Sequence, residues 1–249
     1  MIRTLYLAFP VLISLLSGKN TEQQLFIEAN NYMIINKYSE AISSYEKLIS
    51  LGNKNSEIFY NLGNAYYRNN DLGLSIWAYL SSLKLKPRSD DALYNLSITM
   101  SQTNNHIDLP KNNFIFSYYK KIKSNYTFDE FFFVGSLIFL TFSILSLLIR
   151  TRFLESQYIL FLNKSTLILF LSVLLMNIDK YYYIKIKKGV AISKFTDAYS
   201  GPGYVQNKVI FRLNEGALVN INNTKGDWVE IMLIDGKKGW VQKKLVRNI

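Results

Sequence analysis

The 249-residue sequence contains no cysteine and a single histidine, His106. Without cysteine the chain can form no disulfide and can carry no thiolate metal site, catalytic cysteine or thiol-linked lipid anchor. One histidine excludes multi-histidine metal centres and paired-histidine chemistry. The sequence also lacks a phosphate-binding P-loop, a dinucleotide-binding glycine motif and a nucleophile motif near His106. We therefore expect a protein that is not an enzyme and that uses no cofactor and no metal.

Acidic residues are also scarce, and the charge is unevenly distributed. The formal net charge is +11, and the mean hydropathy of +0.05 is high for so basic a chain. Residues 111–188 hold eleven basic and four acidic residues. Because these residues flank apolar segments, phospholipid headgroups explain the excess better than nucleic acid does. We expect contact with membrane lipid and none with nucleic acid.

The N-terminus has the pattern of an export signal. Arg3 precedes an apolar run of twelve residues, Leu5 to Leu16, which suits a signal-peptide core and is short for a spanning helix. Leu16 stands where cleavage favours a small residue, so an uncleaved anchor is the alternative. We assign residues 1–18 to a signal peptide or such an anchor.

Residues 21–105 repeat with a period of 34. Small residues recur where two helices would touch, and tyrosines recur beside them. This helix–turn–helix period resembles the tetratricopeptide repeat (TPR), with a third half-unit as the capping helix. The expected contact residues are Ala29, Ala41, Tyr45, Gly63, Ser75 and Tyr79.

The TPR resemblance implies a concave face that binds a peptide or a partner helix. By repeat phase this face comprises Asn30, Tyr60, Asn64, Tyr67, Arg68 and Tyr94. Asn30 and Asn64 recur at one position, where some TPR proteins hold a peptide carboxylate. We expect both amides to point into an open groove, and their alternative role is that of solvated helix residues.

Two apolar segments follow a basic linker over residues 106–130. Residues 131–149 contain no charge, and nineteen helical residues cover about 28 Å, the thickness of a hydrocarbon core. The second segment, 159–180, contains Lys164, which would snorkel to the headgroups. The short loop between the segments predicts an antiparallel transmembrane hairpin, and the alternative is a buried hairpin of a soluble protein.

The orientation of this hairpin has two conflicting indicators. The flanking lysines favour a cytoplasmic location for the soluble parts. The export signal favours the periplasm, and two later spans would keep both soluble parts on the side where the first one emerged. We follow the export signal.

Residues 189–249 read as short β-branched strands separated by glycine turns, among them Asp235-Gly236. The Gly-Asp-Trp at 226–228 and the Gly-Trp-Val at 239–241 resemble the bacterial SH3-like domain, a small all-β barrel. Trp228, Gly239 and Trp240 are expected in its core, with ligand contact as the alternative for the tryptophans. We expect this barrel to fold alone, because the two modules need not share a core.

The predicted fold is thus a multidomain membrane protein with an α-helical TPR solenoid, a transmembrane helical hairpin and an SH3-like barrel. This order resembles BatE, a component family of the Bacteroides aerotolerance (Bat) system. The resemblance implies a bacterial inner-membrane scaffold with periplasmic modules, whose partners are von Willebrand-domain Bat proteins and a MoxR-type ATPase. The alternative is a cell-envelope sensor whose SH3-like domain binds peptidoglycan peptides.

Overall fold

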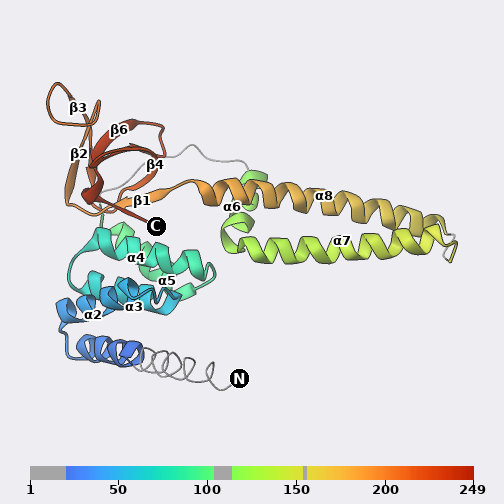
Figure 1. The fold of residues 1–249 in the computed structure, drawn as a ribbon, viewed down its shortest axis with the longest axis horizontal. Coiled ribbons are helices and arrows are strands. Elements are labelled where there is room, and N and C mark those ends of the chain that lie inside the picture. Colours follow the sequence, from blue (N-terminus) through green and yellow to red (C-terminus); the bar gives the residue numbers. More distant parts are fainter. Residues whose placement is uncertain (1–20, 104–113, 154–155) are drawn as a thin grey trace, which may run out of the picture. The chain divides into compact units, whose positions relative to one another are not determined.

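The computed structural model describes residues 21–103, 114–153 and 156–249, with only the backbone for 114–117 (Figure 1). The chain forms two compact units. One comprises the N-terminal repeats and residues 187–249, and the other comprises residues 109–186. The expected signal peptide lies outside the described residues.

The repeat module, residues 21–103, is entirely helical apart from its turns. Residues 21–34 form a first helix, and four more follow: α2 (Tyr38–Ser50), α3 (Ser56–Arg68), α4 (Leu72–Leu85) and α5 (Asp90–Ser101). Asn36 and Asn70 lie in the turns between the two helices of successive units, with positive φ angles of 58° and 65°. Asparagine tolerates this left-handed conformation better than most residues, so both turns occur at one phase of the repeat.

Close helix contact explains the small residues of the repeat. A Cβ on Gly63 would lie 2.6 Å from Cε1 of Tyr79, so α3 and α4 could not approach as they do with a larger residue there. The Ser75 hydroxyl donates to the Gly63 carbonyl oxygen at 2.9 Å. The structure buries all six expected contact residues, Ala29, Ala41, Tyr45, Gly63, Ser75 and Tyr79.

The second unit contains α6 (Phe114–Asn125), α7 (Phe128–Arg150) and α8 (Gln157–Lys185). The expected linker thus includes a helix, and both apolar helices extend beyond the segments expected from the sequence. Thr127 begins α7 with a capping box, in which its hydroxyl accepts from the Glu130 amide and the Glu130 carboxylate accepts from the Thr127 amide.

Apolar side chains of α7 and α8 face outward. Phe132 is 64% exposed and Leu175 is 67% exposed. Both helices are long and apolar enough to cross a membrane, and they bury almost none of their surface within the described structure. A helix at the core of a soluble protein would bury such residues instead.

The sheet domain, residues 188–249, is a seven-stranded antiparallel sheet with the order β3-β2-β6-β5-β4-β1-β7. The strands are β1 (Lys188–Ala191), β2 (Phe195–Tyr199), β3 (Val209–Asn214), β4 (Leu218–Lys225), β5 (Trp228–Met232), β6 (Lys238–Gln242) and β7 (Val246–Asn248). Gly236 turns β5 into β6 with a φ of +86°. Ala198, Val229, Ile231 and Val241 lie at the centre of its core.

The repeats and the sheet domain share core residues, whereas from the sequence we expected modules that need not do so. Val190 on β1 is fully buried among the repeat residues, and Ile249 packs against the same cluster. The Trp77 indole donates to the Asn248 carbonyl oxygen at 2.7 Å, and the Gly73 amide donates to the Glu215 carboxylate at 2.7 Å. We call this contact the seam.

Charge is paired within the seam. The Arg247 guanidinium lies 3.6 Å from the ring centroid of Trp77 and 2.8 Å from the Glu46 carboxylate. It also donates to the Tyr66 hydroxyl at 3.3 Å. The neighbouring Glu46 and Tyr66 raise the pKa of Arg247 against the opposing effect of burial. A cation held between a ring and a carboxylate fixes the geometry of the two modules.

Candidate protein-binding groove

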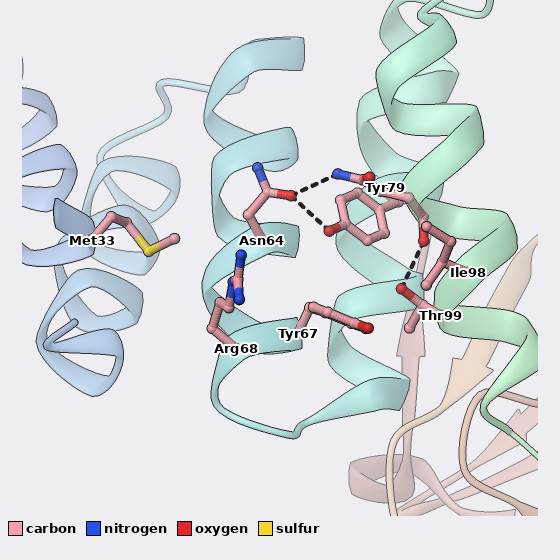
Figure 2. Close-up of a pocket in the computed structure, with 8 residues that line it drawn as sticks. Met33, Asn64, Tyr67, Arg68, Tyr79, Ile98 and Thr99 are labelled. Atoms are coloured by element: carbon pink, nitrogen blue, oxygen red, sulfur yellow. Dashed lines mark hydrogen bonds between the residues drawn. The ribbon is translucent and has the colours of Figure 1, made fainter.

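The repeat module contains a groove of about 340 Å³ between its first helix, α3, α4 and α5 (Figure 2). Its size suits a few side chains of a bound segment rather than a large cofactor. Both polar and apolar side chains line the groove. They are those of Met33, Asn64, Tyr67, Arg68, Tyr79, Asn95, Ile98 and Thr99.

Asn64 anchors a hydrogen-bond network at the base of the groove. Its Oδ1 accepts from the Tyr79 hydroxyl at 2.7 Å and from Nδ2 of Asn95 at 3.0 Å. Figure 2 shows the amide nitrogen of Asn64 turned away from both bonds. The carboxamide oxygen is therefore used internally, while the amide group is left as a donor for a ligand.

The same network occurs one repeat earlier. Oδ1 of Asn30 accepts from the Tyr45 hydroxyl at 2.5 Å and from Nδ2 of Asn61 at 3.3 Å. Each partner is 34 residues before its counterpart, so the repeat conserves a polar network as well as an apolar core. We call Asn30 and Asn64, with their tyrosine and asparagine partners, the asparagine ladder of the repeats.

The tyrosines of this ladder remain donors at physiological pH. Burial raises the pKa of Tyr45 and of Tyr79 to about 12. Their hydroxyls stay protonated, and each can satisfy an asparagine oxygen across the whole physiological range. The orientation of both asparagine side chains is fixed as a result.

A basic residue and a further hydroxyl complete the groove. Arg68 is exposed at the C-terminal end of α3. The Tyr67 hydroxyl accepts from Nε2 of Gln102 at 2.7 Å. Guanidinium and amide donors that converge on one groove can bind carbonyl or carboxylate oxygens of a peptide.

The structure brings together only part of the face expected from the sequence. Asn64, Tyr67 and Arg68 line the groove, and Tyr60 adjoins it because its hydroxyl accepts from Asn95. Asn30 belongs to the preceding network. Tyr94, 67% exposed, does not line this groove.

Sequence reasoning missed Asn95 and its counterpart Asn61. The signal that could have found them was their separation of 34 residues, the period of the repeat itself. Asn64 lines the groove, but its carboxamide is not wholly available to a ligand. Its oxygen is bound by two neighbours, and only its amide nitrogen faces away from them.

The expected core tryptophans of the sheet domain are not in its core. Trp228 and Trp240 are both partly exposed, whereas the neighbouring Val229 and Val241 are buried. Successive strand residues face opposite sides, so the two valines occupy the interior positions. Gly239 is buried, and a Cβ there would lie 2.9 Å from Cβ of Ala198.

Trp228 belongs instead to a cluster of three aromatic rings on the outer face. Its ring lies 5.6 Å from Tyr199 and 5.0 Å from Tyr204, in edge-to-face arrangements. Nδ2 of Asn207 holds the intervening loop by donating to the Gly203 carbonyl oxygen at 3.1 Å. The sheet domain therefore presents an ordered aromatic surface.

Comparison with known proteins supports both modules. The family model of the TPR repeat matches residues 29–70, and that of the bacterial SH3 domain matches residues 194–248. No curated protein matches the chain.

Among solved structures, the chain is similar to the Sgt2 TPR domain from Aspergillus fumigatus. The identity is 20% and the TM-score is 0.31, over 41% of this chain. The chain covers 60% of the length of that structure. From the family models, the chain contains a TPR repeat and a bacterial SH3 domain, joined through two long apolar helices.

Proposed function

We propose that this protein is a non-enzymatic, membrane-anchored adaptor that binds a protein partner in the groove of its repeat module. The asparagine ladder is the observation that carries this proposal. It fixes the carboxamides of Asn30 and Asn64 by internal bonds, and it leaves the amide nitrogen of Asn64 turned away from those bonds in the groove that Arg68 also lines. Pre-oriented donors suit the main-chain or carboxylate oxygens of an extended segment.

The helices α7 and α8 would anchor the adaptor in a bilayer. Their outward apolar side chains are not packed against other parts of the described structure, and lipid tails would cover them. The seam supports an even number of spans. Residues before α7 and after α8 can share a core only on one side of a membrane.

The periplasmic location and the partners extend this proposal. The resemblance to BatE supports an inner-membrane site in a Bat-type complex, with von Willebrand-domain proteins and a MoxR-type ATPase as partners. The export signal expected at residues 1–18 supports a periplasmic position for the repeats and the sheet domain.

Charge reversal in the groove tests the adaptor. Arg68→Glu should reduce binding of the captured partner by about tenfold, because a convergent cation is replaced by an anion. Lys54→Glu makes the same change at an exposed residue in the turn between α2 and α3, outside the groove lining, and should leave binding unchanged. The measurement is quantitative co-purification from mild-detergent extracts. Equal loss in both variants, or loss in neither, would contradict a partner site in the groove.

The aromatic surface favours a second candidate, binding of peptidoglycan by the sheet domain. Trp228→Leu should then weaken retention of the full chain on cell-wall sacculi. Phe195→Leu changes a 65% exposed aromatic residue outside the three-ring cluster and should not. Retention that is equal in both variants and in the wild type would exclude this role for the cluster.

A further inference from the structure

The loop end of the β2–β3 hairpin is apolar, basic and exposed. Tyr204 is 57% exposed, Val205 81%, Val209 51% and Ile210 54%. Apolar residues scattered over a surface need no explanation, but these four lie within seven positions of the chain. This group, together with Lys208, is called the hairpin tip.

Hydrogen bonds within the loop fix the conformation of the tip. The Ser200 amide donates to the Lys208 carbonyl oxygen at 2.9 Å, and Asn207 bonds the Gly203 carbonyl oxygen. Tyr204 rests against Trp228. Because the loop is already ordered, its exposed apolar side chains would lose little conformational entropy on entering an apolar environment.

The charge of the tip has one sign. Lys208 is exposed, and the sequence contains no acidic residue between Asp197 and Glu215. Asp197 is already paired with Arg212 at 2.6 Å. An apolar surface with a basic side chain matches the interface of an anionic bilayer, where apolar groups enter the acyl boundary and lysine meets phosphate.

The sheet domain that carries the tip follows α8 directly in the chain. α8 ends at Lys185 and β1 begins at Lys188, which leaves two residues between them. Two residues span at most about 7 Å, and a domain of this size has a radius of gyration of about 11 Å. The tip is therefore carried by a domain that a short stretch of chain tethers to the end of α8.

We propose that the hairpin tip is a lipid-binding site that inserts into the headgroup region of the membrane in which α7 and α8 are anchored. The proposal rests on the membrane insertion of these helices. It assigns the sheet domain a lipid surface as a ligand, in addition to any protein or cell-wall partner.

The absence of native cysteine allows a direct test with single cysteines in the full chain. Val205→Cys, labelled with an environment-sensitive dye and reconstituted into anionic vesicles, should show blue-shifted emission. Nitroxide lipids should quench it about twofold more than the matched Ile234→Cys, because Ile234, 53% exposed, lies in the β5–β6 turn. Lys208→Glu in the Val205→Cys background should reduce the quenching.

Leu175→Cys on α8 separates the two proposals. If Leu175→Cys is quenched while Val205→Cys and Ile234→Cys behave alike, the helices are inserted and the tip does not bind lipid. If Leu175→Cys is not quenched, membrane insertion fails and the tip proposal fails with it. A blue shift at Val205 that disappears on dilution into excess lipid would assign the tip to a second copy of the chain and overturn the proposal.

Discussion

Leucines of the repeat module and leucines of α8 have opposite environments within one chain. Leu48 and Leu62 are fully buried, whereas Leu175 is 67% exposed. The repeats and the sheet domain bury their apolar residues within their own cores and at the seam, and α7 and α8 turn theirs outward. This difference is the one expected if the first unit folds in water and the second lies in hydrocarbon, as proposed above.

The largest change in stability should come from replacing a leucine of the first unit by alanine, compared with the same substitution at a leucine of α8. Leu62→Ala removes a fully buried side chain and should destabilise the repeat module by about 3 kcal/mol, from lost transfer energy and the cavity left behind. Leu175→Ala should change the unfolding of that module by less than about 0.5 kcal/mol. Thermal unfolding of the full chain in detergent gives both values. Similar shifts would contradict the separation into two environments.

Gly63→Leu tests the helix contact inside the water-facing unit. Its side chain would enter the ring of Tyr79, at a cost of about 2–3 kcal/mol. Ser97 occupies the same phase one repeat later and is exposed, so Ser97→Leu should cost less than about 0.5 kcal/mol. Unfolding midpoints of the two variants provide the comparison, and equal midpoints would mean that the repeat phase is misassigned.

Arg247→Ala should lower the free energy of unfolding of the repeats and the sheet domain by about 2 kcal/mol. This value lies between those of surface and buried ion pairs, because Arg247 and Glu46 are both partly exposed. Arg212→Ala, which removes a more exposed arginine from its pair with Asp197, should cost less than about 1 kcal/mol. Limited proteolysis should also cut Arg247→Ala between the modules faster than the wild type. Unchanged proteolysis would argue that the two modules do not depend on the seam.

A smaller effect is expected from the pH dependence of Asp197. The hydrogen bond and charge of Arg212 hold the pKa of this carboxyl below its usual range. The pair therefore stabilises the folded state above the unfolded pKa of about 3.9, and its contribution is lost as the pH falls through the lower folded value. Asp197 is exposed enough that this contribution should stay below about 0.5 kcal/mol.

The check is the difference in stability between wild type and Asp197→Asn, measured near pH 6 and again near pH 2. The wild type should be slightly more stable at the higher pH, and the difference should vanish at the lower one. A difference that grows on acidification would mean that the pair is not what lowers this pKa.

Local periodicity made much of the fold predictable. A period of 34 places a small residue at 63 and an aromatic one at 79, and the structure brings the two into contact. The apolar runs at 131–149 and 159–180 lie within α7 and α8. In each case the deciding interactions are close in sequence or repeat at a fixed interval.

The parts that sequence reasoning missed depend on distant contacts or on strand faces. Glu46 and Arg247 are 201 positions apart, and neither has a local pattern that indicates its partner. The exposure of Trp228 had a local signal, since it shares a strand face with Glu230 while Val229 and Ile231 share the other. A motif-based view of the tryptophan as a core residue overlooked this alternation.

In the proposed topology, α7 and α8 cross a membrane and leave the repeats and the sheet domain together on one side of it. Single cysteines at Lys54, Phe153 and Lys237, one in the repeats, one after α7 and one in the sheet domain, can be labelled with a membrane-impermeant maleimide in intact cells. All three residues are exposed in the structure. This topology, with the repeats and the sheet domain in the periplasm, predicts labelling at Lys54→Cys and Lys237→Cys, and labelling at Phe153→Cys only after the membrane is permeabilised. Equal labelling at all three sites, or different labelling at the first and third, would contradict it.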